Sequence, residues 1–125
     1  MLVIKMLALY NFAFGIFHLF FWKLLKWEEQ LKKVSPVNRA VVQTLNLCLT
    51  FMFFLVGYCL YSYPAEIEQT DLGRALLLGI GLFWFIRSIL QIYLFNMKER
   101  VHKILFVLFV FGAVIHISPF IGIGF

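Results

Sequence analysis

The stretch AVVQTLNLCLTFMFFLVGYCLYSYPA, residues 40–65, contains no acidic or basic side chain. A helix needs about 20 mainly apolar residues to cross a hydrocarbon core of roughly 30 Å, so this stretch is long enough to span a membrane. Three further stretches share its character: residues 6–22 and 104–125 carry no Asp, Glu, Lys or Arg, and residues 75–97 carry Arg87 alone. The sequence therefore predicts an all-α fold, an integral membrane four-helix bundle.

The composition is unlike that of an ordinary soluble domain. The chain has 125 residues, of which 63% are hydrophobic and 14% charged, whereas about a quarter of the residues of a soluble domain are charged. The apolar stretches use nearly the whole chain, so we predict one transmembrane domain, residues 1–125, with helices at about 3–33, 36–63, 71–96 and 102–120. The first of these lacks the small-residue cleavage site of a signal peptide, and we expect it to be retained.

Residues that cap or break helices predict the boundaries. Ser35 is a good N-cap and Pro36 suits the first position of the second helix. Pro64 ends that helix, and Thr70 or Asp71 caps the third. The first helix is expected to continue beyond the membrane surface through KLLKWEEQLKKV, residues 23–34, because apolar residues keep a helical spacing there. We predict a solvated extension, and attraction to anionic lipid headgroups is the alternative.

The charge distribution predicts an orientation. The net charge of +5 is concentrated in connections 23–39 and 96–103, an arrangement that argues against a nucleic-acid partner. The second connection carries Glu66, Glu68 and Asp71 against Arg74. Because an excess of Lys and Arg in short loops marks the cytoplasmic side, we predict a multi-pass protein of the cell membrane whose connections 23–39 and 96–103 are cytoplasmic. Both termini are then outside, with Lys5 as a minor exception to the rule.

Every predicted helix contributes polar side chains at similar depths. At 1.5 Å per residue from the expected cytoplasmic ends, a middle layer lies about 15–18 Å deep and a shallower layer about 5–9 Å deep. The middle layer is Arg87, Thr50, Asn11 and His116, and the shallower layer is His18, Gln43, Asn46 and Gln91. On each helix these residues are three, four or seven positions apart, so they share a face. The pattern predicts a polar interior, and interhelical hydrogen bonding is the simpler role for each amide, hydroxyl or imidazole taken alone.

Arg87 is the residue that this simpler role explains least well. A charge at the centre of a membrane helix costs at least about 2.5 kcal/mol, and none of the expected spans contains Asp or Glu to neutralise it. Its protein partners would be backbone carbonyls, amides and imidazoles. We therefore predict that it faces water or a bound anion, with a structural hydrogen-bonding role as the alternative.

These residues suggest three kinds of function. The first is a site that binds or conducts a small anionic or hydrogen-bond-accepting ligand. Its residues would be Arg87, Asn11, His116, Asn46, Gln91, His18, Gln43 and Thr50. The second is a redox subunit in which His18 and His116 hold haem or face a quinone, and the third is a non-catalytic structural or assembly subunit.

We favour the binding site over an enzyme. The sequence contains no His-x-x-His, Cys-x-x-Cys or carboxylate cluster that would predict a metal site, so we expect neither a metal nor a cofactor. The expected partners are the lipid bilayer, a small anionic ligand, and a second copy of the chain or another membrane protein.

Overall fold

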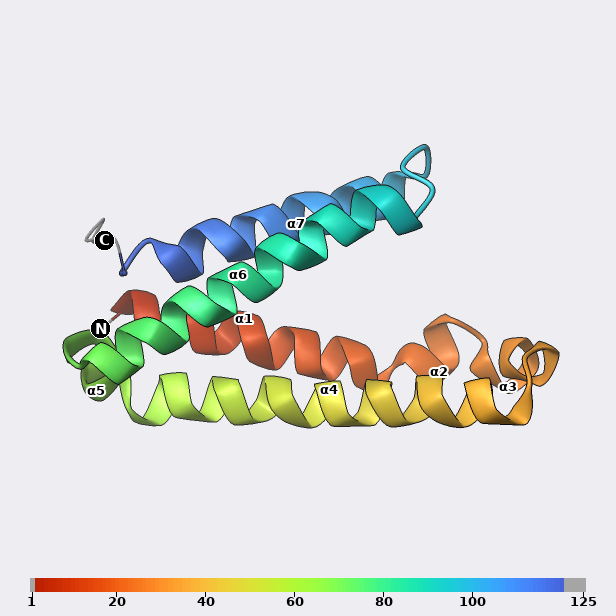
Figure 1. Cartoon of the computed structure of the whole chain (residues 1–125), viewed down its shortest axis with the longest axis horizontal. Coiled ribbons are helices and arrows are strands. Elements are labelled where there is room, and N and C mark those ends of the chain that lie inside the picture. Colours follow the sequence, from red (N-terminus) through yellow and green to blue (C-terminus); the bar gives the residue numbers. More distant parts are fainter. Residues whose placement is uncertain (1, 121–125) are drawn as a thin grey trace. The chain divides into compact units, whose positions relative to one another are not determined.

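The structure is a computed structural model that describes residues 2–120, and these residues form helices without any strand. The elements in chain order are α1 (Leu2–Leu19), α2 (Phe21–Leu24), α3 (Trp27–Gln30), the 3₁₀ helix η1 (Leu31–Lys33), α4 (Pro36–Ser62), α5 (Pro64–Gln69), α6 (Asp71–Leu94) and α7 (Arg100–Ile117) (Figure 1). Four of them, α1, α4, α6 and α7, are long and apolar enough to cross a membrane. The predicted all-α class with four membrane helices is confirmed.

The predicted helix over about 3–33 differs from the structure, which divides it into four elements. The α-helix breaks after Leu19 and again at Lys26, whose φ of 52° is left-handed. Beyond this break the chain folds back toward the start of α4: Leu31 is buried, and its carbonyl accepts a hydrogen bond of 2.9 Å from Arg39 Nε. Burying one leucine contributes about 1.5–3 kcal/mol, more than the few tenths expected from each i,i+4 ion pair of a straight helix.

The described chain divides into two compact units. The single transmembrane domain expected from the sequence stays a prediction. The N-terminal unit comprises residues 8–62. Within it, glycines let aromatic rings approach closely: a Cβ at Gly15 would lie 3.1 Å from the Phe54 ring, and one at Gly57 would lie 2.9 Å from Phe12. Small residues that admit large neighbours are typical of packed membrane helices. The last turns of α1 and the body of α4 therefore form a helix pair.

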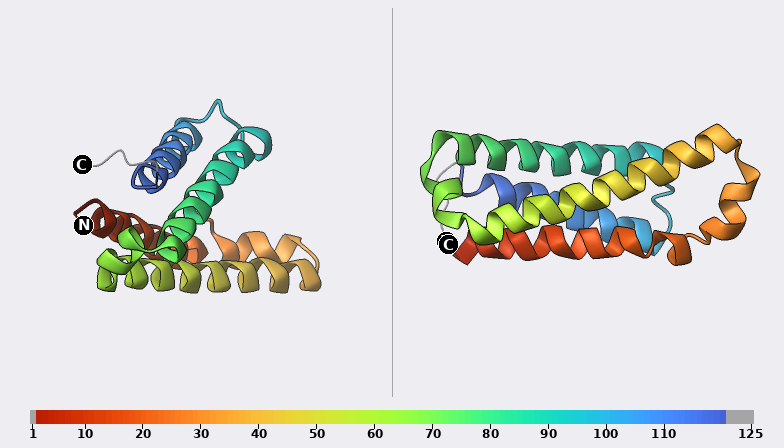
Figure 2. Two further views of the ribbon diagram at one scale, coloured as in Figure 1. Left: turned by 60° about the vertical axis from the view of Figure 1, so that its left-hand side comes forward. Right: turned by 90° about the horizontal axis from the view of Figure 1, so that it is seen from below.

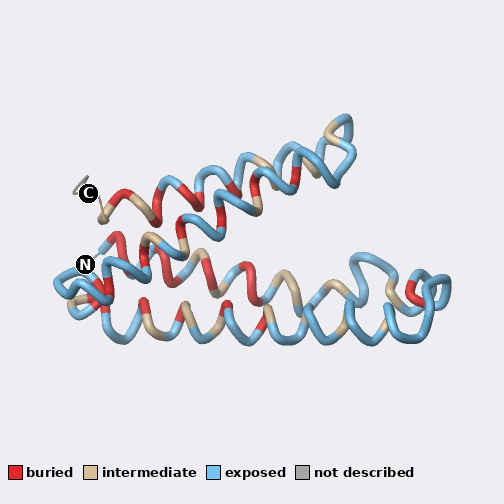
Figure 3. The backbone as a smooth tube through the Cα atoms, viewed as in Figure 1, coloured by how far each residue is buried: buried red, intermediate tan, exposed pale blue. Residues whose placement is uncertain are grey.

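The C-terminal unit comprises residues 63–120 together with residues 2–7. Its helices α6 and α7 run antiparallel side by side, as the three ribbon views show (Figures 1 and 2). The buried residues of α6 recur three or four positions apart and so form one face (Figure 3). They are Gly73, Leu77, Gly81, Trp84, Ser88 and Gln91. On this face Gly81 lies against the Ile117 side chain, and the Trp84 ring stacks on Phe109 with centroids 5.7 Å apart.

The predicted caps of α4 and α6 are confirmed. Ser35 Oγ accepts a hydrogen bond of 3.3 Å from the backbone N–H of Asn38, the third residue of α4. Thr70 Oγ1 accepts one of 3.0 Å from the backbone N–H of Gly73. Each bond satisfies an N–H that has no partner inside its own helix.

We expect Thr70→Ala to lower the free energy of unfolding by about 1 kcal/mol, because the Gly73 N–H loses its acceptor. Thermal unfolding in one detergent would measure the change. Thr70→Ser keeps the hydroxyl and serves as the control. Equal stability of the alanine and serine variants would show that this cap contributes nothing.

Candidate intramembrane site

Arg87 lies on α6, with its guanidinium over aromatic rings. Its Cζ is 4.4 Å from the centroid of Phe109 on α7 and 5.1 Å from that of Phe95, the residue that ends α6. Both distances are within the range of a cation–π interaction. No hydrogen bond or ion pair joins the guanidinium to any residue between 2 and 120. The charge is therefore held by two rings, and its N–H donors have no acceptor in the described chain.

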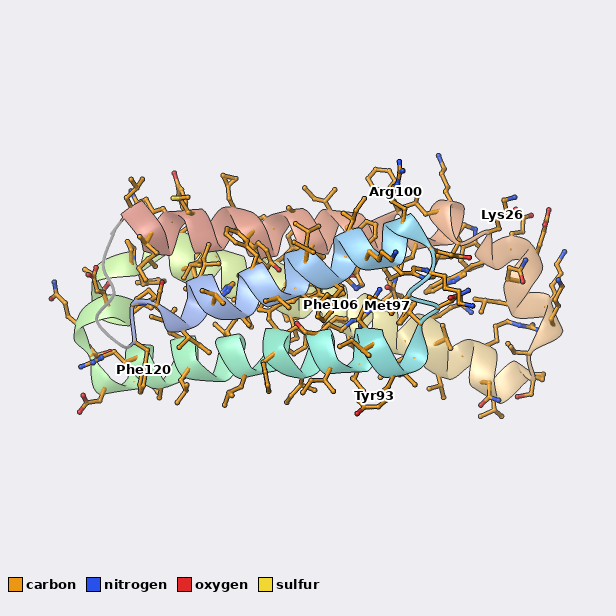
Figure 4. The ribbon with its side chains drawn as sticks, turned by 90° about the horizontal axis from the view of Figure 1, so that it is seen from above. Lys26, Tyr93, Met97, Arg100, Phe106 and Phe120 are labelled. Atoms are coloured by element: carbon orange, nitrogen blue, oxygen red, sulfur yellow. The ribbon has the colours of Figure 1, made fainter. Side chains whose placement is uncertain are left out.

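Arg87 is less deep in its helix than the sequence suggests. The helix α6 ends at Leu94, before the expected end near residue 96. Arg87 precedes Leu94 by seven residues, which is about 10 Å of helix, whereas the sequence-based depth is about 15 Å. Met97 and Arg100 lie at this end of the α6–α7 pair and Phe120 at the other (Figure 4). Arg87 therefore lies on the connection side of the middle of α6, and its guanidinium contacts Phe95, the first residue beyond the helix.

Gln91 occupies the next turn of α6 and joins it to α7. The side chain is fully buried, and its Nε2 donates a hydrogen bond of 3.1 Å to the backbone carbonyl of His102. The Gln91 side chain therefore joins α6 to α7 beside Arg87 through its Nε2. Its Oε1 is a buried acceptor that receives no hydrogen bond from the described residues.

His116 lies elsewhere on the α6–α7 pair. It is fully buried, and its Nδ1 is 2.7 Å from the carbonyl oxygen of Gly112. Phe109, which contacts Arg87, precedes His116 by seven residues or about 10 Å of helix. The α7 turn that holds His116 packs instead near Gly81, which touches Ile117. Arg87 and His116 are therefore at different levels of the C-terminal unit.

The polar residues of the N-terminal unit bond mostly to nearby backbone carbonyls. Asn46 Nδ2 donates to the His18 carbonyl at 3.1 Å and so joins α4 to α1. Gln43 Nε2 donates to the Arg39 carbonyl at 3.2 Å, and Thr50 Oγ1 donates to the Asn46 carbonyl at 2.7 Å. The Asn46 bond fits the interhelical role, whereas the other two remain within α4.

His18 and Asn11 complete the polar set of α1. His18 Nδ1 is 2.7 Å from the Phe14 carbonyl oxygen, and its ring lies 4.3 Å from Phe21 and 5.0 Å from Phe53, centroid to centroid. Asn11 is almost completely buried. The eight predicted site residues thus fall into two groups: Arg87, Gln91 and His116 in the C-terminal unit, and Asn11, His18, Gln43, Asn46 and Thr50 in the N-terminal unit.

Sequence reasoning did not identify the aromatic partners of Arg87. Phe95 and Phe109 belong to a composition with 16 phenylalanines, and nothing in their spacing distinguishes them from rings that face lipid. His102 is also partly buried. Its ring packs edge-on to Phe95 with centroids 5.2 Å apart, and its Nδ1 lies 3.5 Å from Glu99 Oε2. These contacts depend on the register of α6 against α7, which the spacing of residues along one helix does not reveal.

The two ends of the C-terminal unit carry opposite charge. The α6–α7 connection and the first turn of α7 hold Lys98, Arg100 and Lys103 with Glu99. The other end holds three acidic residues against Arg74 and Lys5, and Arg74 Nη2 donates a hydrogen bond of 3.1 Å to the Phe120 carbonyl. The basic end is the one nearer to Arg87. The predicted orientation, which rests on these same charges, stays a prediction.

Four apolar helices of spanning length place the chain in the class of multi-pass membrane proteins. Comparison with protein-family models, curated proteins and solved structures found no match to the chain. Among residues 2–120, no group of three His, Cys, Asp or Glu side chains is placed to hold a metal ion. The functional argument therefore depends on Arg87 and its surroundings.

Proposed function

We propose that this membrane protein binds or conducts a small anionic or hydrogen-bond-accepting ligand at Arg87, between α6 and α7. One observation carries the proposal. Arg87 lies within a membrane-spanning helix, and its guanidinium has aromatic rings but no hydrogen-bond acceptor among the described residues. The ligand would supply the missing acceptors.

The aromatic contacts alone do not account for an arginine at this position. A cation–π contact contributes about 0.5–1 kcal/mol at an exposed site and about 2 when desolvated. Arginine costs at least about 2.5 kcal/mol at the centre of a membrane helix and less toward its end, and the rings accept none of its five N–H donors in ordinary hydrogen bonds. A carboxylate, phosphate or inorganic anion could take two of these donors at once, in bonds assisted by opposite charge.

The surroundings of Arg87 favour an anion over a cation. The basic residues of the α6–α7 connection, Lys98, Arg100 and Lys103, lie at the nearer end of the helix pair. A cluster of one sign raises the local concentration of ions of opposite sign. None of the four spanning helices carries an Asp or Glu in its interior, so a cation would find no countercharge there. The proposed orientation, with connections 23–39 and 96–103 cytoplasmic, would let the anion approach from the cytoplasm.

Ligand-dependent stabilisation tests the proposal. The thermal unfolding of purified wild type, Arg87→Gln and Arg87→Lys would be followed with chloride, nitrate, phosphate and short-chain carboxylates. We expect at least one anion to stabilise wild type, and we expect its affinity to fall about 10- to 100-fold in Arg87→Gln, because a hydrogen bond to a charged group contributes about 1.5–3 kcal/mol. Arg87→Lys keeps the charge without the planar fork of donors and should bind with intermediate affinity.

Arg74→Gln is the matched control for this experiment. Arg74 is on the same helix, but its guanidinium already donates to the Phe120 carbonyl and lies over the Phe120 ring. Its replacement should leave the anion response unchanged. If no anion stabilises wild type, or if Arg87→Gln responds like wild type, Arg87 is not an anion site.

A structural or assembly role is the second candidate. It is favoured by two amide bonds that join neighbouring helices, Asn46 to the His18 carbonyl and Gln91 to the His102 carbonyl. Such bonds contribute around 0.6 kcal/mol each in membrane proteins. In this role the chain would pair with a second copy or another membrane protein, and Arg87 would join α6 to α7 through its contact with the Phe109 ring.

A further inference from the structure

The connection between α1 and α4 exposes apolar and basic side chains together. We call residues 20–35 the connecting segment; it contains α2, α3 and η1. Trp22, Leu24 and Leu25 are 46%, 58% and 48% exposed. Exposing large apolar side chains to water is unfavourable. We therefore expect this segment to contact both lipid and water.

The basic side chains of the connecting segment are exposed beside these apolar ones. Lys23, Lys26, Lys32 and Lys33 are all exposed. Against them stand Glu28 and Glu29, so the segment carries four positive and two negative charges, a net +2. Lysine can lay its apolar stem along other apolar groups while its ammonium stays in water. Alternating lysines and exposed leucines suit the boundary between acyl chains and headgroups.

Aromatic packing holds the segment in a defined conformation. Trp27 lies edge-on to Phe21 and to Trp22, with centroids 5.9 Å and 6.5 Å apart, and Phe21 in turn packs on His18 of α1. Tryptophan is enriched where membrane and water meet. At its far end the segment is tied to α4 by Arg39, which donates to the Leu31 carbonyl.

The flanking helices fix where the segment lies. Both α1, which precedes it, and α4, which follows it, are membrane-spanning. The chain leaves the membrane at the end of α1 and returns at the start of α4, so the connecting segment lies at the membrane surface. Its lysines are then at the depth of lipid headgroups.

We propose that the connecting segment is a binding surface for anionic phospholipid headgroups. The four lysines supply the attraction, and the tryptophans and leucines set the depth. A basic residue near an anionic membrane surface contributes about a fivefold preference for binding. A neutral or zwitterionic lipid would gain nothing from the lysines, so the surface distinguishes lipids by charge. This inference is independent of any ligand at Arg87.

Tryptophan fluorescence in lipid vesicles tests the proposal locally. The chain has three tryptophans, so a Trp84→Phe variant emits from Trp22 and Trp27 alone, both within the connecting segment. The protein would be reconstituted in mixtures of phosphatidylcholine and phosphatidylglycerol, with the quenching bromine on one lipid or the other. At equal mole fractions and low salt, we expect the anionic lipid to quench several-fold more strongly. Replacing all four lysines by glutamine should bring the two lipids to equal quenching.

Two controls make the result specific. Lys98→Gln with Lys103→Gln removes basic residues from the other basic connection and should leave the lipid preference of Trp22 and Trp27 unchanged. Added salt should weaken the wild-type preference, because exposed charges are screened. If the glutamine variant does not fold, native mass spectrometry of wild type with the same lipid mixture still measures the preference. Equal binding of both lipids by wild type, or an unchanged preference in the folded glutamine variant, would overturn the proposal.

Discussion

Arg87→Leu is expected to unfold at the same temperature as wild type or a higher one when no ligand is present. On an insertion scale, arginine costs about 2.5–3.5 kcal/mol at the centre of a membrane helix, which is the upper limit for Arg87, and leucine gains about 0.3–0.6 kcal/mol. The substitution removes two cation–π contacts, with Phe109 and Phe95, worth about 1 kcal/mol each for a half-buried arginine. The net expectation lies between no change and a gain of about 2 kcal/mol in the free energy of unfolding.

Thermal unfolding of both proteins in one detergent measures this difference. A leucine variant that is as stable as wild type means that the charge is kept at a cost to the fold, which favours a functional role. A loss of several kcal/mol, or failure to fold, would contradict the expectation and would favour the structural role, with Arg87 holding α6 and α7 together.

Gly81→Ala is expected to destabilise the α6–α7 pair, whereas Gly79→Ala is not. A Cβ at Gly81 would overlap Ile117 and lie 3.4 Å from the Ala113 carbonyl oxygen, but a Cβ at Gly79 has no neighbour within 4 Å. Overpacking costs about 1–3 kcal/mol. Alanine is better than glycine in a helix by up to about 1 kcal/mol at either position, so the two variants should differ by the overpacking cost, about 1–3 kcal/mol, with Gly81→Ala the less stable.

The two glycines make a matched pair because they lie two residues apart on one helix and receive the same substitution. Thermal or denaturant unfolding of each variant, compared with wild type, gives this difference in one experiment. Equal behaviour of the two variants would mean that Gly81 does not lie at the α6–α7 contact. A Gly81 effect that disappears in the double variant Gly81→Ala, Ile117→Ala, measured against Ile117→Ala alone, would assign the cost to the Ile117 side chain.

The membrane helices could be predicted because a hydrocarbon core demands length and low charge, and both are visible in sequence. The caps at Ser35 and Thr70 were equally predictable, since they depend on residues next to the helix ends. The region from residue 20 to 33 was not. Its apolar spacing fits a straight helix, and the burial of Leu31 and the hydrogen bonds of Arg39, which break that helix, depend on contacts with α4.

The candidate site was predictable as a set of polar residues but not as an arrangement. Arg87 and Gln91 share a face of α6 as expected from their spacing, and His116 Nδ1 contacts the Gly112 carbonyl oxygen one turn before it. The spacing of residues along one helix does not determine how that helix is aligned with its neighbour. That alignment sets Arg87 over Phe109 and places His116 about 10 Å further along α7.

Lys26 has a consequence for attempts to stabilise this protein. It is the one non-glycine residue with a positive φ among residues 2–120, a conformation that costs most L-residues about 1–2 kcal/mol and glycine little. A stability screen would therefore be drawn to glycine at position 26. The variants that it selected would have a higher free energy of unfolding but one positive charge fewer on the proposed lipid-binding surface. At this residue a gain in stability would therefore lower the affinity for anionic lipid.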